Sequence, residues 1–498
     1  MKMKSLSLFG PEQSKKKGMN DFMKKICLLL AMLFLLSCFG GCTLEGTKQE
    51  EEVNPGYSTE IPTYADDKQL EVMAFWSPPI NEQSYTWMKE CGITAVLVDN
   101  KFDAQSGSNR RRILEMCTDL DIDVYFPMSR DQSGEAIKNY ENWLEYSSFA
   151  GFYCDEPITK GHIDNIADQA REAQALSPEL RMISNMLSDY SDNGEGYGWI
   201  YSDQADYQAA LADGQFFSNY EAYVKYMQDT VIGRYDNVVV SATNYPLAAW
   251  DKGYDTTLVE TWLKTLGLSK QTALQCDKDM WQFIATTAYH SGGKEFYHRQ
   301  PVEADIRWMN YVALAYGATG IEEFVYTTVG AGVEFDEDDH GPIWWMDVND
   351  TSSYYRTDMW YAVQAVHQEL FEFDHVLLSF DWKGVLCHNV TDDPSVTPVF
   401  ENAVGKLEKH ERLQDIDSTG DLLIGCFEDD NDYDGFLVVN FTETARNSYL
   451  KNEVSIRFDY ANKALVYVNG EEQLIELKDH TYTGTLLPGD AFFIIPIA

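Results

Sequence analysis

Residues 149–157 read Phe149-Ala150-Gly151-Phe152-Tyr153-Cys154-Asp155-Glu156-Pro157. The short apolar run predicts a strand, and the proline ends it because proline cannot donate to a strand ladder. Two adjacent carboxylates therefore come at the end of the strand. In a barrel of parallel strands this end forms the mouth, where a carboxyl group beside an apolar interior can have a raised pKa. The alternative is that Asp155 caps the next helix and that Glu156-Pro157 opens it.

Strands and helices alternate on both sides of this segment. The pattern predicts strands over 70–76, 93–99, 122–127, 149–155, 180–185, 237–244, 281–287 and 320–326. Helices are expected between them, over 81–90, 110–120, 135–146, 163–175 and 217–230, in a further unit before residue 281, and over 302–316. Eight such units predict an α/β fold of the (β/α)8 TIM-barrel type. No glycine-rich nucleotide fingerprint follows the first strand, which disfavours a Rossmann fold.

The pattern changes after a helix predicted over 358–371. Strands are expected over 384–389, 422–427, 436–441, 453–458, 464–468 and 491–495, which predicts a small C-terminal β-sandwich. The predicted barrel spans 68–373 and the predicted sandwich spans 374–498. Residues 430–435 match the start of a calcium loop, but the twelfth position is Phe441, so a hairpin turn is favoured. No metal and no cofactor are expected.

The N-terminal region predicts export. Three residues, Met23-Lys24-Lys25, precede the apolar run 26–36, which is too short for an ordinary transmembrane helix. Cys38 and Cys42 follow small residues, so the segment 1–42 resembles a bacterial lipoprotein signal in which one of these cysteines is lipidated. A simple cleaved secretory signal is the alternative. Residues 43–67 lack apolar periodicity and are expected to form a flexible tether at the cell surface.

The composition restricts the partners. A net charge of -42 argues against nucleic acid or an anionic lipid surface, since phosphates would be repelled, and leaves the expected lipid anchor as the only membrane contact. Aromatic residues make up 13% of the chain, and aromatic faces stack on neutral sugars, although a large core also requires them. Six cysteines beyond the signal are scattered, which indicates neither a zinc site nor a disulfide framework. Cys154 adjoins the acids, but no histidine lies nearby in sequence, which disfavours a catalytic thiol.

Polar and aromatic residues lie at the predicted strand ends. In a barrel these ends meet at one face, so they predict a polar pocket with aromatic walls. Amides and carboxylates can bind vicinal hydroxyls, and Trp76 offers a flat face to a pyranose ring. Each residue alone is more often structural, and their shared position favours a site. The predicted substrate-binding residues are Trp76, Asp99, Asn185, Asn244, Tyr245, His290 and Tyr326.

Three segments together resemble bacterial barrel glycoside hydrolases. They are residues 74–76, residues 151–157, and residues 299–301 with 313–321. The likeness covers the whole barrel and is nearest to relatives of the β-galactosidase and cellulase superfamily that carry Asp-Glu-Pro. The resemblance implies hydrolysis of O-glycosidic bonds in oligo- or polysaccharides, with Glu156 as the general acid/base.

The second carboxylate of a retaining glycosidase is missing from the predicted seventh strand, 281–287. One alternative is that Glu322 or Glu323 supplies it, since strand alternation turns one of the two inward. A second is substrate assistance, which the resemblance to hexosaminidases implies, with Asp155 orienting an acetamido group and Glu156 as the acid. A third is a carbohydrate-binding lipoprotein without catalysis. A long loop around 334–345 is expected over the mouth, where Trp344 and Trp345 either form a sugar subsite or pack on the barrel.

Overall fold

The computed structural model describes residues 54–98, 106–189, 212–247, 256–291, 296–329, 340–347, 349–390, 397–401, 403–442 and 451–498. The chain from Asn54 to Ala498 forms one compact unit. The candidate lipidation sites Cys38 and Cys42 lie outside the described residues. Within the described part, no helix is both long enough and apolar enough to cross a membrane.

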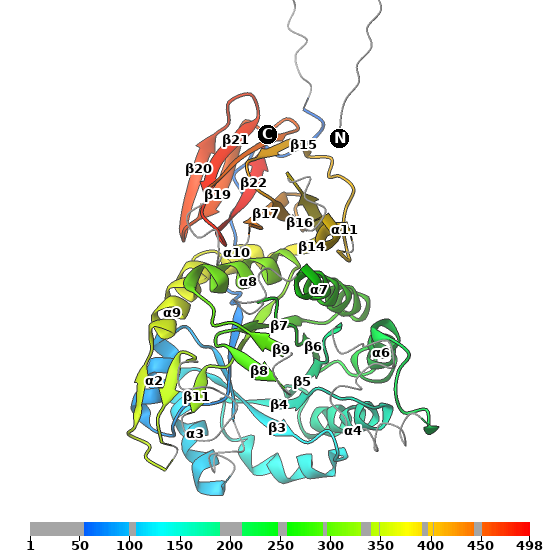
Figure 1. Cartoon of the computed structure of the whole chain (residues 1–498), viewed down its shortest axis with the longest axis vertical. Coiled ribbons are helices and arrows are strands. Elements are labelled where there is room, and N and C mark those ends of the chain that lie inside the picture. Colours follow the sequence, from blue (N-terminus) through cyan, green and yellow to red (C-terminus); the bar gives the residue numbers. More distant parts are fainter. Residues whose placement is uncertain are drawn as a thin grey trace, which may run out of the picture. The chain divides into compact units, whose positions relative to one another are not determined.

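Eight parallel strands close into a barrel, which confirms the predicted (β/α)8 class (Figure 1). They follow one another around the barrel in chain order, and β10 closes it against β1. The carboxyl ends of all eight strands therefore meet at one mouth. The strands are β1 (Glu71–Phe75), β2 (Ala95–Leu97), β3 (Asp123–Met128), β4 (Phe149–Asp155), β5 (Arg181–Met186), β6 (Val238–Ala242), β7 (Met280–Ala285) and β10 (Gly320–Phe324).

Helical segments follow the barrel strands. Four of the helices begin at a polar cap, namely Asn81, Ser106, Thr159 or Asn219, whose side chain accepts a hydrogen bond from the backbone three residues on. The segment after β3 is a 3-10 helix, η1 (Gly134–Trp143), where the sequence predicts an ordinary helix. The others are α2 (Glu82–Glu90), α3 (Gly107–Leu120), α4 (Lys160–Leu176), α6 (Tyr220–Met227) with η4 (Gln228–Ile232), α7 (Thr256–Cys276), α8 (Glu303–Ala315) and α9 (Asp358–Phe371).

Smaller elements extend two of the barrel's loops. A hairpin follows β7, and a three-stranded sheet follows β10, which puts most of the predicted loop 334–345 into β12 or outside the described residues. These strands are β8 (Tyr289–Ser291), β9 (Phe296–His298), β11 (Thr327–Val329), β12 (Ile343–Trp345) and β13 (Tyr354–Arg356). Two short helices follow, α10 (Asp374–Leu377) and α11 (Thr397–Glu401).

The C-terminal part consists of two antiparallel sheets around an apolar core, in agreement with the predicted β-sandwich. The six predicted strands are present, and three more were not predicted: β15, β20 and β21. Polar residues make up most of β15 and β20, and β21 turns only Tyr482 and Leu486 into the core, so none of the three has a continuous apolar run. The strands are β14 (Phe380–His388), β15 (Leu413–Ser418), β16 (Leu422–Asp429), β17 (Asp434–Asn440), β18 (Asn452–Phe458), β19 (Lys463–Val468), β20 (Glu471–Glu476), β21 (Thr481–Leu486) and β22 (Ala491–Ile497).

The barrel core extends to one face of the six-stranded sheet, while the interior of the sandwich is a separate cluster. Helix α8 packs on β16 and β17, and the Trp382 indole donates to the Ala315 carbonyl at 2.9 Å. A side chain at Gly425 would meet that carbonyl at 2.5 Å, so only glycine allows this approach. The domain boundaries inferred from the sequence stay predictions, because the core continues across residue 374.

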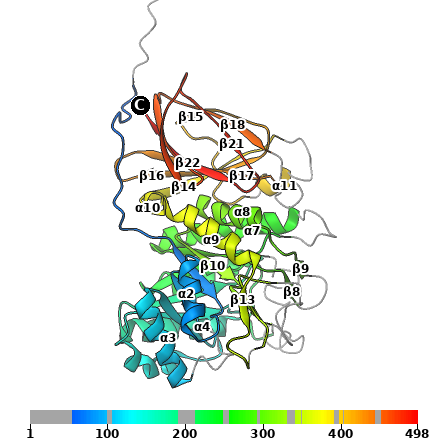
Figure 2. The ribbon, with the colours of Figure 1, turned by 90° about the vertical axis from the view of Figure 1, so that its left-hand side faces the viewer.

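Residues 54–67 lie along the sandwich, although the sequence predicts a flexible tether there. Figure 2 traces this segment in dark blue beside the C-terminal strands. Tyr57 lies over the buried Arg412 guanidinium at 3.5 Å, and Tyr64 packs on Phe380. The backbone of Ala498 donates to Ser58, which fixes the two ends of the described chain together. Residues 54–67 are therefore packed against the sandwich and do not form the flexible tether that the sequence predicts.

Candidate active site

The acid pair lies at the end of β4. Asp155 is the last residue of the strand and is exposed, and Glu156 follows it half-buried. Glu156 has a positive φ of 40°, an unusual backbone for a residue with a side chain. Its N–H donates to the Asn185 carbonyl at 3.1 Å, and its carbonyl accepts from Arg130. Backbone strain held by two such contacts is typical of a functional position.

Helix capping does not use Asp155. The N-cap of α4 is Thr159, whose hydroxyl accepts from the His162 backbone at 3.2 Å. The Asp155 carboxylate instead accepts from the buried Asn185 amide at 2.7 Å. The pKa of Asp155 is raised by the protein that encloses it, while Asn185 and Arg130 oppose this shift. The carboxylate is accessible from the mouth and enclosed on its other sides, so exposure and a raised pKa coexist.

Glu156 is the stronger candidate for a proton donor. Burial raises its pKa to about 8, and the Asp155 charge adds to the shift, while Arg130 and Thr243 oppose it. Asp155 ionises first in this pair, because it has the amide of Asn185 as a donor. Glu156 therefore keeps its proton at neutral pH, which is what a general acid requires.

The two glutamates of β10 point to opposite sides of the strand. Glu322 points into the barrel, where its Oε1 is hydrogen-bonded to the Ser241 hydroxyl on β6 and where it lies near Tyr153 and Asp155. Glu323 points outward to α9, where its carboxylate lies 2.9 Å from the His367 imidazole, outside regular hydrogen-bond geometry. Both are wholly buried. Neither is exposed at the mouth, so neither can meet a substrate in this conformation.

Aromatic rings surround the barrel interior near the carboxyl ends of its strands. Trp76 is half-buried and packs on Phe75 and Phe324, with centroid distances of 6.1 and 6.2 Å. Tyr245 contacts Phe324 at 5.4 Å and Phe283 at 6.3 Å. Trp76 and Tyr245 thus share one aromatic cluster, and the partly accessible face of Trp76 can receive a sugar ring.

The other predicted site residues lie elsewhere. Asn244 is buried and donates to Thr265 on α7, and Tyr326 is buried beside Cys91 and Trp360. Trp344 and Trp345 are buried in β12, where Trp344 lies 4.3 Å from the His340 ring. Asp99 lies outside the described residues, as does the side chain of His290.

Three side chains, Tyr153, Ser241 and Thr243, complete the site without having been predicted for it. Tyr153 precedes Asp155 by two positions, so the strand period already places both on one face. Ser241 on β6 and Thr243 just beyond it show the same spacing, and both hydroxyls lie within 3.3 Å of the side-chain oxygen Oδ1 of Asn185. Arg130, which the position after the third predicted strand already places in the pocket, donates a hydrogen bond to the backbone carbonyl of Glu156.

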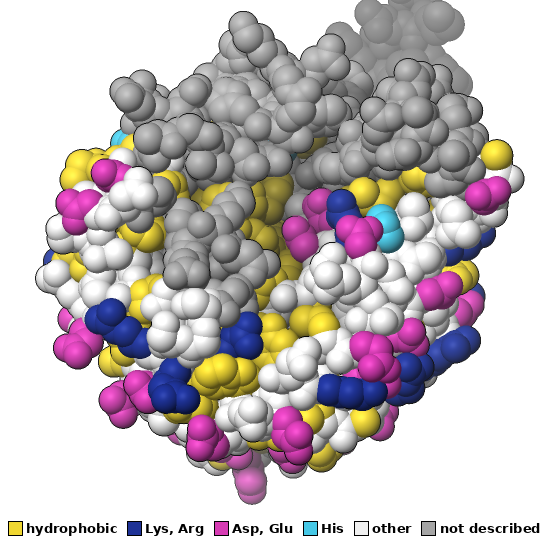
Figure 3. Space-filling model, turned by 90° about the horizontal axis from the view of Figure 1, so that it is seen from below, with side chains coloured by type: hydrophobic (Ala, Val, Ile, Leu, Met, Phe, Trp, Pro, Cys, Tyr) yellow, Lys and Arg dark blue, Asp and Glu magenta, His cyan; other side chains and the backbone are white. Residues whose placement is uncertain are grey.

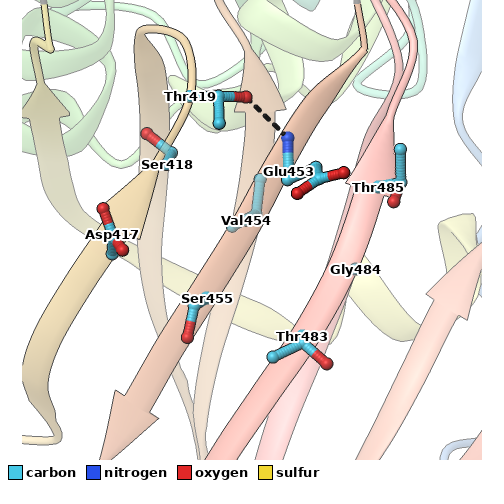
Figure 4. Close-up of a pocket in the computed structure, with 9 residues that line it drawn as sticks. All are labelled: Asp417, Ser418, Thr419, Glu453, Val454, Ser455, Thr483, Gly484 and Thr485. Carbon is cyan, nitrogen blue, oxygen red and sulfur yellow. Dashed lines mark hydrogen bonds between the residues drawn. The ribbon is translucent and has the colours of Figure 1, made fainter.

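One face of the molecule is hollowed. Figure 3 shows hydrophobic side chains in the hollow and, along one rim, acidic side chains beside a basic and a histidine side chain. A second concavity, of about 360 Å³, lies on the sandwich, over β15, β18 and β21. Hydroxyls and two carboxylates line it, and Glu453 donates its backbone N–H to Thr419 (Figure 4). The second concavity has no aromatic wall, so it is the weaker candidate for catalysis.

The described residues offer neither a metal site nor a reactive thiol. They contain no group of three or more metal-ligating side chains. Cys154 is buried, and burial raises the pKa of its thiol well above the usual range. A thiolate nucleophile next to the acid pair is therefore disfavoured.

No protein-family model matches the chain, and no curated protein matches it in sequence. Solved structures of glycoside hydrolases do match. A catalytic mutant of a GH42 β-galactosidase from G. stearothermophilus is 8% identical, with 88% of this chain and 99% of that one covered and a TM-score of 0.49. An α-amylase from Anoxybacillus is 11% identical (86% and 98% covered, TM-score 0.42). A GH27 β-L-arabinopyranosidase from Geobacillus stearothermophilus is 9% identical (87% and 97% covered, TM-score 0.39). At these scores the likenesses carry no argument about the chemistry of this chain.

Proposed function

We propose that this protein is a glycoside hydrolase that cleaves O-glycosidic bonds of oligo- or polysaccharides, with Glu156 as the general acid/base. The acid pair at the end of β4 carries the proposal. Glu156 has a pKa near 8, and its neighbour Asp155 is exposed and held by Asn185. Two adjacent carboxyl groups with different protonation states are suited to one proton donor and one charge stabiliser.

The proton of Glu156 goes to the glycosidic oxygen as the bond from that oxygen to the anomeric carbon breaks. Positive charge then develops on the sugar ring. The Asp155 carboxylate stabilises this charge, either on the ring or on a substrate group to which part of the charge passes. In the second half of the reaction Glu156 takes a proton from water, which adds to the anomeric carbon. The same residue thus acts first as acid and then as base.

Substrate assistance is the route that the described residues favour. Glu322 and Glu323 are wholly buried, and β7 carries no acid, so neither strand offers an accessible carboxylate in addition to the β4 pair. An acetamido oxygen of the substrate would attack the anomeric carbon, and Asp155 would accept a hydrogen bond from the acetamido N–H. The intermediate is a cyclised sugar, which water opens with Glu156 as the base.

A carbohydrate-binding protein without catalysis is the second candidate. The missing acid on β7 favours it, and the aromatic cluster around Trp76 would serve it equally well. In either case we infer an exported protein anchored through Cys38 or Cys42, with a carbohydrate as its partner and no nucleic acid.

Release of nitrophenol from glycosides with and without a 2-acetamido group tests the proposal. We expect the wild-type protein to cleave acetamido sugars, and both Glu156→Gln and Asp155→Asn to abolish this cleavage. Cleavage of plain hexosides would contradict substrate assistance and would require a nucleophile outside the described strands. Binding of sugars without any cleavage by the wild type would overturn the hydrolase in favour of the binding protein.

A further inference from the structure

A chain of hydrogen bonds connects the mouth of the barrel to its interior. Asp155 accepts from the Asn185 amide nitrogen at 2.7 Å. The amide oxygen of Asn185 lies 3.3 Å from the Ser241 hydroxyl, and this hydroxyl also contacts Glu322 Oε1. The chain therefore links β4, β5, β6 and β10, from an exposed carboxylate to a wholly buried one.

The direction in which each hydrogen bond of this chain is donated follows from the number of protons that each group carries. A serine hydroxyl has one proton, so Ser241 can donate either to Glu322 or to Asn185, but not to both. The amide of Asn185 is oriented by Asp155, because a carboxylate can only accept, and its oxygen therefore faces Ser241. If Glu322 carries a proton, it donates to Ser241, and Ser241 then donates to Asn185. Every group in the chain then has a partner.

The surroundings of Glu322 favour the protonated form. Its second oxygen, Oε2, is buried and has no hydrogen-bond partner among the described residues. The ionisable groups that face it are Asp155 and Tyr153, both on β4, and neither is a cation. Burial raises its pKa to about 8. The Ser241 hydroxyl opposes this shift, the Asp155 charge adds a smaller increase, and the Tyr153 hydroxyl opposes it least. An ionised carboxylate with an unpaired oxygen in this interior would be costly.

We propose that Glu322 is a neutral positioning acid, which fixes the Asp155 carboxylate through Ser241 and Asn185. Its effect on turnover rests on the proposed function, whereas its protonation and its coupling to Asp155 do not. Glu322 is then not the missing nucleophile. When Glu322 ionises above neutral pH, the Ser241 hydroxyl turns to donate to it and no longer donates to the Asn185 side-chain oxygen. Of the two hydroxyls near that oxygen only Thr243 then remains as a donor, which weakens the hold of Asn185 on Asp155.

The first test needs no substrate. Glu322→Gln keeps a neutral donor of the same size, and its Tm is compared with that of the wild type from pH 5 to pH 9. The folded wild type keeps a proton that the unfolded chain loses above its ordinary pKa of about 4.3. Wild-type stability therefore falls relative to the glutamine variant as the pH rises to about 8, and the difference then levels off. A difference in Tm that does not change with pH would overturn the neutral acid.

The coupling to Asp155 is tested with a double-mutant cycle. Ser241→Ala breaks the chain in the middle, and Asp155→Asn changes its outer end. We expect the two losses of Tm at pH 6 to be less than additive, because both variants disrupt one chain. Glu179 is an exposed acid outside the barrel interior. Glu179→Gln combined with Ser241→Ala serves as the matched control, and the losses of Tm of these two substitutions should add. Additive losses for Ser241→Ala and Asp155→Asn would overturn the relay.

The same variants separate positioning from nucleophilic catalysis once a cleaved substrate is known. We expect Glu322→Gln to keep kcat/KM within about threefold at pH 6 and to weaken the decline at alkaline pH. Ser241→Ala should lower kcat at least tenfold with little change in KM. A collapse of activity in Glu322→Gln would assign Glu322 as the nucleophile and overturn the positioning role. If no wild-type turnover is found, the proposed hydrolase fails, and the two Tm experiments still decide the role of Glu322.

Discussion

Two acidic pairs in this barrel have similar sequences and different environments. Asp155 is the last residue of β4 and Glu156 follows it, so the backbone leaves the strand and both carboxyl groups reach the mouth region. Glu322-Glu323 lies within β10, so alternation sends one side chain inward and the other outward, and both are buried. Position along the strand decides what the carboxyl groups can do. The β4 pair can meet a ligand, whereas the β10 pair can act only through other residues.

The largest effect should come from the β4 pair. Glu156→Gln removes the proposed proton donor, so kcat/KM on a cleaved glycoside should fall by about 10²–10⁴-fold. The side chain is of similar size, and the Tm should change little. Glu179→Gln is the matched control and should keep full activity. Full activity in Glu156→Gln would show that the β4 pair is no more important for catalysis than the β10 pair.

The outer member of the β10 pair should matter for stability. Glu323→Ala leaves the buried His367 imidazole opposite an empty space, and a buried polar group without its neighbour costs about 1–3 kcal/mol. Urea unfolding measures this loss, with Glu179→Ala expected to change the free energy of unfolding by less than about 0.5 kcal/mol. A loss in Glu323→Ala no larger than that of the control would mean that the pair does not stabilise the junction of β10 and α9.

The pH dependence tests the protonation of the β4 pair. Glu156 has to be protonated to act as an acid, and its pKa is about 8. We expect kcat/KM to fall about tenfold for each pH unit above 8 and to lie on a plateau just below it. A decline that already begins near pH 5 would indicate an ordinary carboxyl group and a different proton donor.

The smallest effect should come from the aromatic wall. Trp76→Ala removes one ring face, which is worth about 0.5–1.5 kcal/mol, so KM should rise by about twofold to tenfold. Tyr355→Ala removes an exposed ring from β13 and should leave KM unchanged. Equal effects of the two substitutions would deny Trp76 a role in binding.

Periodicity in the sequence predicts the barrel strands because buried parallel strands are short apolar runs between amphipathic helices. It fails for β15, β20 and β21, whose polar residues face solvent. It also fails for residues 54–67, where Tyr57 and Tyr64 find their partners more than 300 positions along the chain. Local patterns cannot reveal contacts of that range.

The candidate site is predictable where a strand sets the direction of a side chain. Asp155 and Asn185 belong to β4 and β5, and the structure brings them together. Asn244 and Tyr326 lie two residues beyond β6 and β10, where alternation no longer governs direction, and both turn away from the acid pair. The opposite directions of Glu322 and Glu323 follow from alternation, but their complete burial does not, because α9 and the barrel interior cover them.

The most direct test of the difference between the two pairs compares Glu156→Gln with Glu322→Gln on one acetamido glycoside at pH 6. Both substitutions replace a carboxyl group by an amide of the same shape, so the position in the barrel is the main variable. We predict that kcat/KM collapses in Glu156→Gln and stays within about threefold of the wild type in Glu322→Gln. The reverse result, with activity lost in Glu322→Gln and kept in Glu156→Gln, would contradict the account and move the chemistry to β10.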